Sequence, residues 1–276
     1  MTDETPTLPQ EIDLENASVA RVYDALLGGK DNFASDREVY RSVVAADPLA
    51  PRAAQEVRRC LGRVVDWLVR QAGMDQFLDL GSGLPTAENT HEIAQRINPD
   101  ADVVYVDNDP SVIAHGRALM QDDESTWFTA GDLADPDGIL DCPVISEKLD
   151  LQRPYALVQF STLHHVADSG NPRDIMQKYV QRLPSGSYVA LCHFFDAGAE
   201  DPQQSAFAQD MQQRLLGSSM GSGWFRTRAE ILSFLDGLDL VEPGLVKVHE
   251  WWPVGPRCTE LSQMDESVVV AVARKP

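Results

Sequence analysis

The stretch Phe77-Leu78-Asp79-Leu80-Gly81-Ser82-Gly83-Leu84-Pro85-Thr86 decides the fold. Its first four residues are mostly apolar and strand-like, two glycines follow, and a helical pattern runs from about Ala87 to Ile97. This order predicts a strand, a tight turn and a helix whose first backbone amides point at a ligand. Glycine suits such a turn because it reaches positive φ without strain and lets a ligand approach the backbone. The stretch therefore predicts a site for a nucleotide-like cofactor.

The spacing of the glycines argues against a dinucleotide. Dinucleotide-binding folds carry G-x-G-x-x-G, whose third glycine lets the helix pack on the strand. Gly81 and Gly83 fit this pattern, but Thr86 stands in the third position, after Pro85. Asp79 lies two residues before the first glycine, where its carboxylate can accept a hydrogen bond from an ammonium group. A cofactor with an amino-acid end fits this turn better than one with two phosphates.

A longer pattern joins this turn to three other segments, which are Ala20–Asp24, Leu26–Asn32 and Val104–Pro110. With them the sequence resembles the class I S-adenosylmethionine-dependent methyltransferases, whose first motif is an acid followed by G-x-G. It is similar in particular to a bacterial methyltransferase family of unassigned substrate, over roughly residues 16–275. The resemblance implies S-adenosylmethionine as the cofactor.

The expected fold is α/β. Apolar runs of the length of buried parallel strands recur along the chain, and they are Val103–Val106, Ser125–Ala130, Tyr155–Phe160 and Tyr188–Phe194. Two last runs, Leu245–Trp252 and Ser267–Val272, have no helical pattern between them, which predicts an antiparallel hairpin at the sheet edge. The resemblance implies a Rossmann-like, mostly parallel sheet of seven strands with an antiparallel last strand and an N-terminal helical addition.

Composition limits the class of protein. The chain has 276 residues, of which 43% are hydrophobic, enough for one large α/β domain. No apolar run approaches the ~18 residues of a membrane span, and the acidic N-terminus is unlike a secretory signal, so we expect a cytoplasmic protein. A net charge of −20 disfavours nucleic acids and anionic membranes as partners. The four cysteines show no C-x-x-C spacing, so we expect reduced thiols and no metal site. The sequence leaves the oligomeric state open.

Three parts follow one another along the chain. Residues 1–15 are acidic and predict a mobile arm. Residues 16–73 carry amphipathic helical patterns, from Ser18 to Leu27 and from about Pro51 to Ala72, and predict a helical cap. Residues 74–276 would form the cofactor-binding domain, with an insertion at about 197–223 that could border the acceptor.

Acids at the ends of consecutive strands are the strongest site signal. Asp107 follows the second strand, where a carboxylate can hold both hydroxyls of a ribose, and Asp109 caps the next helix at Pro110. The resemblance assigns Asp132, in Gly131-Asp132-Leu133, to the adenine amino group, although this acid could simply open a turn. It also implies that the turn and the strand ends touch the cofactor through Gly81, Ser82, Gly83, Asn108, Leu133, Phe160 and Ser161.

The segment Lys30-Asp31-Asn32-Phe33 follows the first predicted helix and is polar with one aromatic residue. It could close over a pocket or could merely connect two helices, and the residues alone do not decide between these. The resemblance favours a lid, with Tyr23, Lys30 and Asn32 as candidates to face the acceptor.

His164, in Leu163-His164-His165-Val166 after the fourth strand, is the candidate catalytic base, because an unperturbed imidazole titrates near neutrality. Its ordinary alternative is a hydrogen-bonded wall residue, and methyl transfer needs a base only where the acceptor must lose a proton. The absence of N-P-P-[FY] from the sequence disfavours nucleic-acid acceptors.

We therefore expect a methyltransferase that acts on a small molecule. The alternatives are an NAD-dependent oxidoreductase and a regulatory protein that binds S-adenosylmethionine without turnover.

Overall fold

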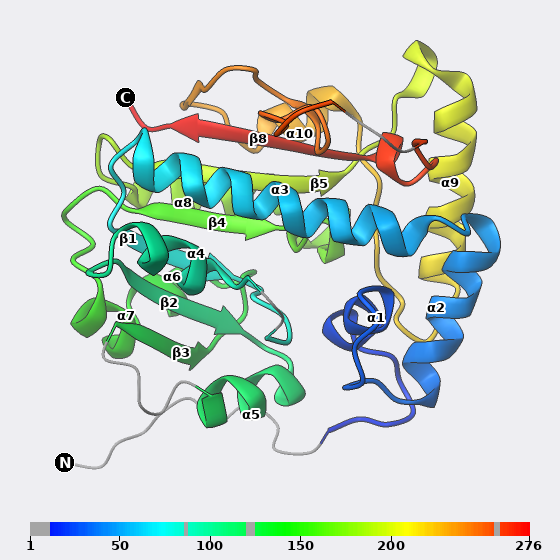
Figure 1. Ribbon diagram of the computed structural model, residues 1–276, viewed down its shortest axis with the longest axis horizontal. Coiled ribbons are helices and arrows are strands. Elements are labelled where there is room, and N and C mark those ends of the chain that lie inside the picture. The colour runs from blue at the N-terminus through cyan, green and yellow to red at the C-terminus, as the bar shows by residue number, and fades with distance from the viewer. Residues whose placement is uncertain (1–11, 86–87, 120–124, 257–259) are drawn as a thin grey trace.

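The centre of the protein is one sheet with the strand order β3-β2-β1-β4-β5-β8-β6, to which β7 adds by pairing with β8 (Figure 1). The computed structural model describes residues 12–85, 88–119, 125–256 and 260–276. Strands β1 to β5 are parallel, and β8 runs antiparallel to β5. The strands are β1 Gln76–Leu80, β2 Asp102–Asp107, β3 Thr126–Ala130, β4 Ala156–Phe160, β5 Tyr188–Phe194, β6 Asp239–Leu240, β7 Val246–Lys247 and β8 Val268–Arg274.

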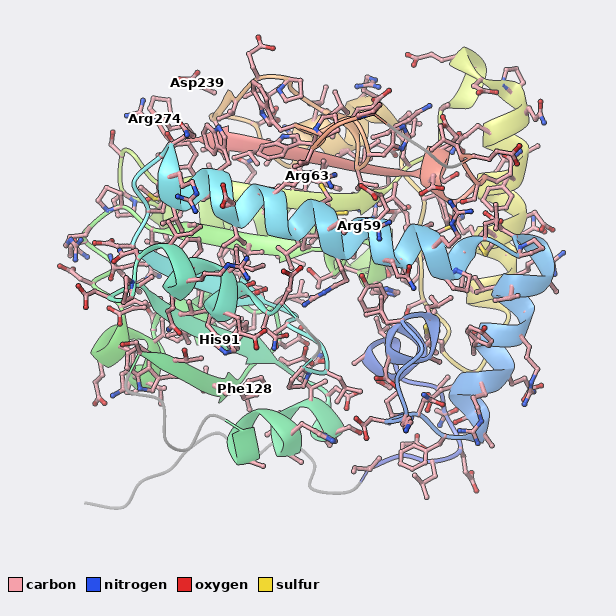
Figure 2. The ribbon with its side chains drawn as sticks, viewed as in Figure 1. Arg59, Arg63, His91, Phe128, Asp239 and Arg274 are labelled. Carbon is pink, nitrogen blue, oxygen red and sulfur yellow. The ribbon has the colours of Figure 1, made fainter. Side chains whose placement is uncertain are left out.

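The observed sheet confirms the predicted α/β class, the parallel core and the antiparallel last strand. The described residues form eight strands, one more than expected, because β6 also pairs with β8. Asp239 of β6 faces Arg274 of β8 at one end of the sheet (Figure 2). The run from Leu245 was predicted as one long strand, but only Val246–Lys247 pairs with β8.

A side chain explains why this last predicted strand is short. Arg63 donates from Nη2 to the carbonyl oxygen of Val248 at 2.7 Å and from Nε to that of Trp251 at 2.9 Å. Because the guanidinium of Arg63 binds these two carbonyls, they are not paired with a neighbouring strand among the described residues. Trp251 is buried against the sheet. After the Val248 amide, which still donates to the Val268 carbonyl of β8, the chain is held by Arg63 of α3 in place of a strand partner.

The helices begin and end close to the predicted patterns. Ser18 caps the first, accepting a hydrogen bond from the amide of Arg21, and Thr227 and Glu230 form a capping box at the start of α10. The helix after the glycine turn begins at Thr90, and Ala87, where it was expected to begin, lies outside the described residues. The α-helices are α1 Val19–Leu26, α2 Ala34–Ala46, α3 Ala50–Arg70, α4 Thr90–Ile97, α5 Pro110–Leu119, α6 Pro136–Leu140, α7 Pro143–Lys148, α8 Pro172–Arg182, α9 Pro202–Leu216 and α10 Arg228–Ser233.

Helices cover both faces of the sheet. On one face, α3 and α4 pack on alternate strand residues such as Phe77, Val103 and Val158. On the other face, α6, α7, α8 and α10 pack on the intervening residues, including Leu78 and Leu157. The sheet is therefore buried on both sides, which explains the continuous apolar runs of its parallel strands.

A third apolar cluster lies beyond the carboxyl ends of the parallel strands. It joins α1, α2, the start of α3 and α9, on the side where the arrows of the parallel strands end (Figure 1). Its buried members are Val22, Val39, Val43, Ala50, Met211 and Leu215. The N-terminal helices and the segment 197–223, predicted separately from the sequence, thus pack against each other.

Two further observations concern the chain as a whole. None of the helices in the described part is both long and apolar enough to cross a membrane. Within the same residues, no group of three or more His, Cys, Asp or Glu side chains is arranged to hold a metal ion. Most of the arm predicted over residues 1–15 lies outside the described residues, as does Cys258.

Candidate functional site

The turn after β1 is open on one side and tightly packed on the other. Gly81 and Gly83 have φ values of 74° and 68°, in the left-handed region. A Cβ atom on Gly81 would lie 2.4 Å from Cγ2 of Thr162, so only glycine fits there. For Gly83, no described residue comes within 4 Å of such an atom. The second glycine therefore presents its backbone to open space, as a ligand site requires.

Asp79 is buried in β1, just before this turn. Its Oδ2 accepts a hydrogen bond from the Thr90 hydroxyl at 2.7 Å, and the residue is 6% exposed. Burial raises the pKa of the carboxyl to about 6, although the hydrogen bond from Thr90 and the positive charge of Arg58 act to lower it. The carboxylate is thus ionised at neutral pH at a cost that a bound cation would offset.

Asp107 ends β2 and faces the same turn. Its Oδ2 accepts from the Gly83 amide and its Oδ1 from the Asp109 amide, both at 2.9 Å. Burial raises its pKa to about 6, against the effect of these backbone donors. A carboxylate has about four acceptor sites, so the backbone donors leave acceptor capacity for a ligand hydroxyl.

Asp132 differs from the first two acids because it is exposed. Its Oδ1 accepts from the Ala134 amide at 2.9 Å, which closes a local turn after β3. Leu133 is half-buried, and its carbonyl oxygen accepts from the Tyr179 hydroxyl at 2.9 Å. Asn108 is exposed beside Asp107. The turn-opening role of Asp132 is visible, and its role toward a purine stays a prediction.

Buried polar atoms without partners surround the turn. Ser82 Oγ, Thr162 Oγ1 and Arg58 Nε are inaccessible and form no hydrogen bond with the described residues. Buried polar groups in folded proteins are nearly always paired. Ser82 lies between the two glycines and Thr162 contacts Gly81, so these unpartnered atoms indicate a site shaped to be completed by a polar ligand.

The end of β4 contributes a strained residue. Ser161 has φ of 64° although it is not glycine, and its hydroxyl donates to Cys192 Sγ at 3.3 Å. Such backbone outliers are concentrated at functional sites. Phe160, just before it, is half-buried against the α3 face of the sheet. The predicted residues Phe160 and Ser161 thus lie at the carboxyl end of the strand next to β1.

The N-terminal cap is tied to this edge of the sheet. The Ser18 hydroxyl donates to Asp109, and the Tyr23 hydroxyl donates to the carbonyl oxygen of Ala54 on α3 at 3.1 Å. Burial raises the pKa of Tyr23. The charge of Arg58 lowers this pKa slightly, and Cys192 raises it slightly. Tyr23 is therefore held near the start of α3.

The other two lid candidates have different surroundings. The Asn32 amide donates to Asp24 Oδ2 at 2.8 Å and to the carbonyl oxygen of Gly29 at 3.1 Å, so it holds the connector in shape. Lys30 is exposed on that connector. The structure places Tyr23 against the start of α3 and gives Asn32 an internal structural contact, and their roles toward an acceptor stay predictions.

His164 lies in an aromatic stack. Its ring lies on Phe194 with centroids 3.6 Å apart, and Phe194 lies on Phe225 at 4.7 Å. The Phe194 amide donates to His164 Nδ1 at 3.3 Å, which leaves the proton of the neutral ring on Nε2. Burial holds the pKa of His164 well below 6.5, with further lowering by the neighbouring His165, His193 and Arg226. This geometry favours the wall role over the base role.

The two neighbouring histidines are also neutral. Burial lowers the pKa of His165 to about 4 and that of His193 to about 3. His193 donates from Nδ1 to the Phe194 carbonyl at 2.7 Å and accepts from Arg226 at 3.1 Å. Arg226 in turn donates to Asp168 at 2.8 Å. The network fixes the segment after β4 against the segment before α10.

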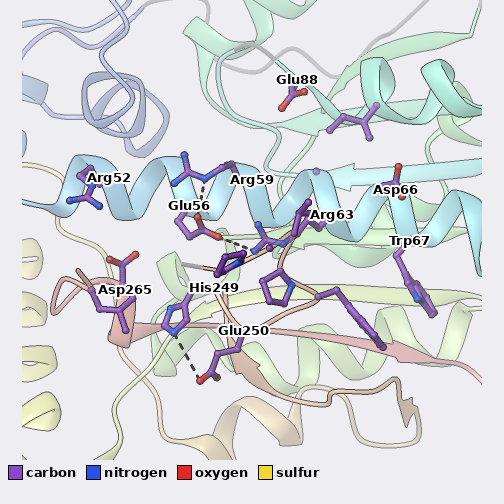
Figure 3. Close-up of a pocket in the computed structure, with 18 of the residues that line it drawn as sticks. Arg52, Glu56, Arg59, Arg63, Asp66, Trp67, Glu88, His249, Glu250 and Asp265 are labelled. Atoms are coloured by element: carbon purple, nitrogen blue, oxygen red, sulfur yellow. Dashed lines mark hydrogen bonds and ion pairs between the residues drawn. The ribbon is translucent and has the colours of Figure 1, made fainter. Parts of the chain in front are cut away.

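A groove of about 1380 Å³ lies elsewhere, between α3, α4 and residues 249–256 (Figure 3). Glu56 lies between Arg59 and Arg63 on its wall, with oxygen-to-nitrogen distances of 2.9 and 3.0 Å. None of the residues assigned to the cofactor from the sequence lines it. Arg59 and Arg63 are thus held by Glu56 on the wall of this groove.

Two residues of the site were not singled out from the sequence. Thr162 contacts Gly81, and no motif marks it. Arg58 is not marked by a motif either, and its Nη2 donates to the Glu88 carbonyl at 3.0 Å. Its position directly after the buried Val57 was the available signal, because it places Arg58 at the border of the apolar stripe of α3.

The comparisons with known proteins agree on one family. The chain matches the S-adenosyl methyltransferase family over residues 5–276. A candidate methyltransferase from Thermobifida fusca has 39% identity and a TM-score of 0.88, over 95% of this chain and 96% of that chain. A DUF574 family protein from Streptomyces avermitilis has 38% identity and a TM-score of 0.88, over 96% and 100% of the two chains. No curated protein matches the chain.

A more distant structure shares the fold alone. It is an O-methyltransferase family protein from Burkholderia thailandensis, with 12% identity and a TM-score of 0.51, over 82% of this chain and 60% of that chain. The family and structure matches confirm the predicted methyltransferase family, fold and cofactor. They favour S-adenosylmethionine over NAD, the cofactor of the alternative oxidoreductase. Over nearly its whole length, the chain belongs to the S-adenosyl methyltransferase family, whose enzymes use S-adenosylmethionine.

Proposed function

We propose that the protein transfers a methyl group from S-adenosylmethionine to a small-molecule acceptor. One observation supports the cofactor site above the others: two buried carboxyls, Asp79 and Asp107, flank a glycine turn that is open to a ligand. Both carboxyls have raised pKa values of about 6, so both are largely ionised at neutral pH, and neither forms an ion pair within 4.0 Å with a described residue. A cationic, hydroxyl-bearing ligand suits this pair.

The residues present fit the cofactor. In our proposal, Asp79 accepts from the ammonium of the methionyl part and Asp107 accepts from the ribose hydroxyls. Gly83 leaves room at the turn, and the unpartnered hydroxyls of Ser82 and Thr162 gain a polar neighbour. Asn108, Asp132, Leu133, Phe160 and Ser161 complete the set at the following strand ends.

The acceptor would lie between the cap and the ends of β4 and β5. In this proposal, residues 16–73 form the cap and residues 74–276 form the cofactor domain. Residues 197–223 of that domain lie on the acceptor side. The third apolar cluster supports it, because α9 packs there with α1 and α2. The wall would include Tyr23 and the stack of His164, Phe194 and Phe225. Lys30 and Asn32 lie on the connector between the first two helices of this cap.

A small acceptor is favoured over a polyanion by charge. The chain carries a net charge of −20, which repels nucleic acids at moderate ionic strength. The cap would also cover the edge of the sheet where the parallel strands end. The hydroxyl of Ser18 in the cap donates to Asp109, which follows β2 at that edge. A compact, uncharged or cationic molecule enters such a site more easily than a long anionic chain.

The chemistry asks the protein mainly for alignment. When bound, S-adenosylmethionine supplies a methyl group already activated by its sulfonium. The chain's own residues would hold the acceptor in line, and orientation alone contributes about 7–11 kcal/mol in favourable cases. The neutral ring of His164 would serve as a wall that fixes the acceptor plane, since its Nδ1 is occupied by the Phe194 amide.

Thermal unfolding with added ligand tests the cofactor. S-adenosylhomocysteine at about 100 times its Kd should add about 2.7 kcal/mol to the free energy of unfolding, and NAD should add nothing. Stabilisation by NAD with no effect of S-adenosylhomocysteine would overturn the proposal.

A labelling experiment tests the acceptor class. The protein is incubated with a bacterial extract and S-adenosylmethionine that carries a labelled methyl group, and the extract is then separated by size. We expect protein-dependent label in the small-molecule fraction. Label confined to nucleic acid or protein would contradict a small acceptor, and tight cofactor binding without any labelled product would favour a regulatory protein.

A further inference from the structure

We propose that Arg58 binds the carboxylate of the methionyl end of the cofactor, opposite the ammonium bound by Asp79. The inference rests on the proposed function and adds a residue that no sequence motif marks. Arg58 and Asp79 would together recognise a zwitterion, so the site would select cofactors with an intact amino-acid end.

Arg58 is directed to the cofactor turn by its contacts. From α3, its Nη2 donates to the Glu88 carbonyl at 3.0 Å and lies 3.5 Å from Asn89 Oδ1. Both acceptors belong to the segment between the glycine turn and α4. The charge of Arg58 also lowers the pKa values of Asp79 and Tyr23, which places it near β1 and near the cap. The guanidinium is therefore bonded to the segment before α4, within electrostatic range of Asp79 and Tyr23.

The guanidinium is incompletely paired. Its Nε is buried and has no hydrogen-bond partner among the described residues. An unpaired buried donor costs about 1–3 kcal/mol, more if it is charged. A carboxylate is the natural complement, since it accepts two parallel hydrogen bonds from a guanidinium.

Asp79 is close enough to sense Arg58 but does not pair with it. Among the described residues, no ion pair within 4.0 Å joins the two side chains. A buried carboxylate and a half-buried guanidinium that stay apart are poorly compensated by each other. A zwitterion inserted between them would offset both, with its ammonium at Asp79 and its carboxylate at Arg58.

The neighbouring arginines show that this arrangement is particular to Arg58. Arg59 pairs with Glu56 at 2.9 Å and is exposed, and Arg63 pairs with Glu56 and with two backbone carbonyls. Figure 3 shows both on the groove side of α3. Arg59 is therefore a matched control: the same residue type, one position away, with a protein partner already in place.

Calorimetric binding of two ligands tests the assignment. One ligand is S-adenosylhomocysteine, and the other is its decarboxylated analogue, which keeps the ammonium. We expect the wild type to prefer the first by at least about tenfold, the loss typical of one charge-assisted hydrogen-bonded pair. Arg58→Gln should lose most of this preference by weakening S-adenosylhomocysteine alone, and Arg59→Gln should retain it.

The outcomes separate this inference from the proposed function. If the wild type binds neither ligand, the proposed function fails. If the wild type binds S-adenosylhomocysteine but Arg58→Gln weakens both ligands equally, the carboxylate assignment fails, and Arg58 serves only to hold the segment before α4. Circular dichroism checks that each variant is folded. If Arg58→Gln does not fold, Arg58→Lys is measured in its place. The lysine variant should reduce the preference at least about threefold because it lacks the bidentate geometry, and an unchanged preference would contradict the assignment.

Discussion

The carboxyl of Asp79 is costly to ionise in the folded protein. Burial raises its pKa from 3.8 to about 6, a shift worth about 3 kcal/mol. Because the folded-state value is the higher one, the protonated carboxyl stabilises the fold below pH 4. That contribution is lost as the pH rises through about 6. At neutral pH the site therefore retains a destabilising charge, which is consistent with a role in binding.

Replacing this charge should stabilise the unliganded protein. Asp79→Asn keeps an oxygen for the Thr90 hydroxyl and removes the buried charge. We expect the free energy of unfolding to rise by about 1–3 kcal/mol at pH 7.5 and to change little at pH 4, as measured by urea titration. Glu38→Gln, at an exposed carboxyl on α2, is the control. An equal gain at both pH values would contradict the assignment of the cost to ionisation.

The same carboxyl should make cofactor binding depend on pH. Below about pH 6 Asp79 is protonated and cannot hold an ammonium, so affinity for S-adenosylhomocysteine should fall about tenfold per pH unit. Calorimetry between pH 5 and pH 8 measures this dependence. In Asp79→Asn the affinity should be low and the dependence on Asp79 should disappear. A flat wild-type profile would remove Asp79 from the binding site.

Asp107 and Asp132 should differ in their importance. Asp107→Ala should weaken S-adenosylhomocysteine by at least about 1–3 kcal/mol, the range for hydrogen-bonding groups left unpaired in a buried site. Asp132→Ala should cost less, because Asp132 is exposed and its interactions compete with water. Dissociation constants of both variants test this order. An unchanged value for Asp107→Ala would refute its ribose assignment.

At the scale of elements, apolar runs predicted the parallel strands well because these strands are buried on both faces. The short strands were harder. Asp239–Leu240 is exposed and carries no apolar run, so nothing in the sequence separates it from a loop. The chain after Lys247 has strand-like residues, but Arg63, distant in sequence, takes its carbonyls. Such contacts between distant residues cannot be read from local pattern.

The residues of the candidate site also fall into those that local sequence predicts and those that depend on distant contacts. Asp79, Gly81, Gly83 and Asp107 could be predicted, because turn geometry and strand ends restrict residue type locally. The contacts of Arg58 could not, since they depend on how α3 is rotated against the segment before α4. The neutral state of His164 was equally out of reach, because burial and the Phe194 amide decide it.

The cap should respond to a change in α9. Met211 is 1% exposed and packs with α1 and α2, so Met211→Ala leaves a cavity that typically costs about 2–5 kcal/mol. Hydrogen exchange should rise in α1, α2 and α9 more than in the central strands. Gln213→Ala, at an exposed position of α9, is the control. A uniform rise across the sheet would show that the cap and the sheet open together.

At the scale of the whole molecule, the dominant feature is charge. A net charge of −20 repels itself in the compact state, and salt screens that repulsion. Raising the ionic strength from about 0.01 to 0.1 M shortens the Debye length from about 30 to 10 Å. We expect the urea midpoint to rise over this range, equally with sodium and potassium chloride. A midpoint that falls with salt would mean that attractive ion pairs outweigh the repulsion.

The two short strands beside β8 have a consequence for solution behaviour. Val241 donates to the Val272 carbonyl near one end of β8, and Val248 donates to the Val268 carbonyl near the other. Both ends of this outer border are thus occupied by the chain itself. An uncovered border of this kind is a template on which a second copy can add a strand and begin a fibril. By covering it in two pieces, the chain guards its C-terminal side against self-templated aggregation.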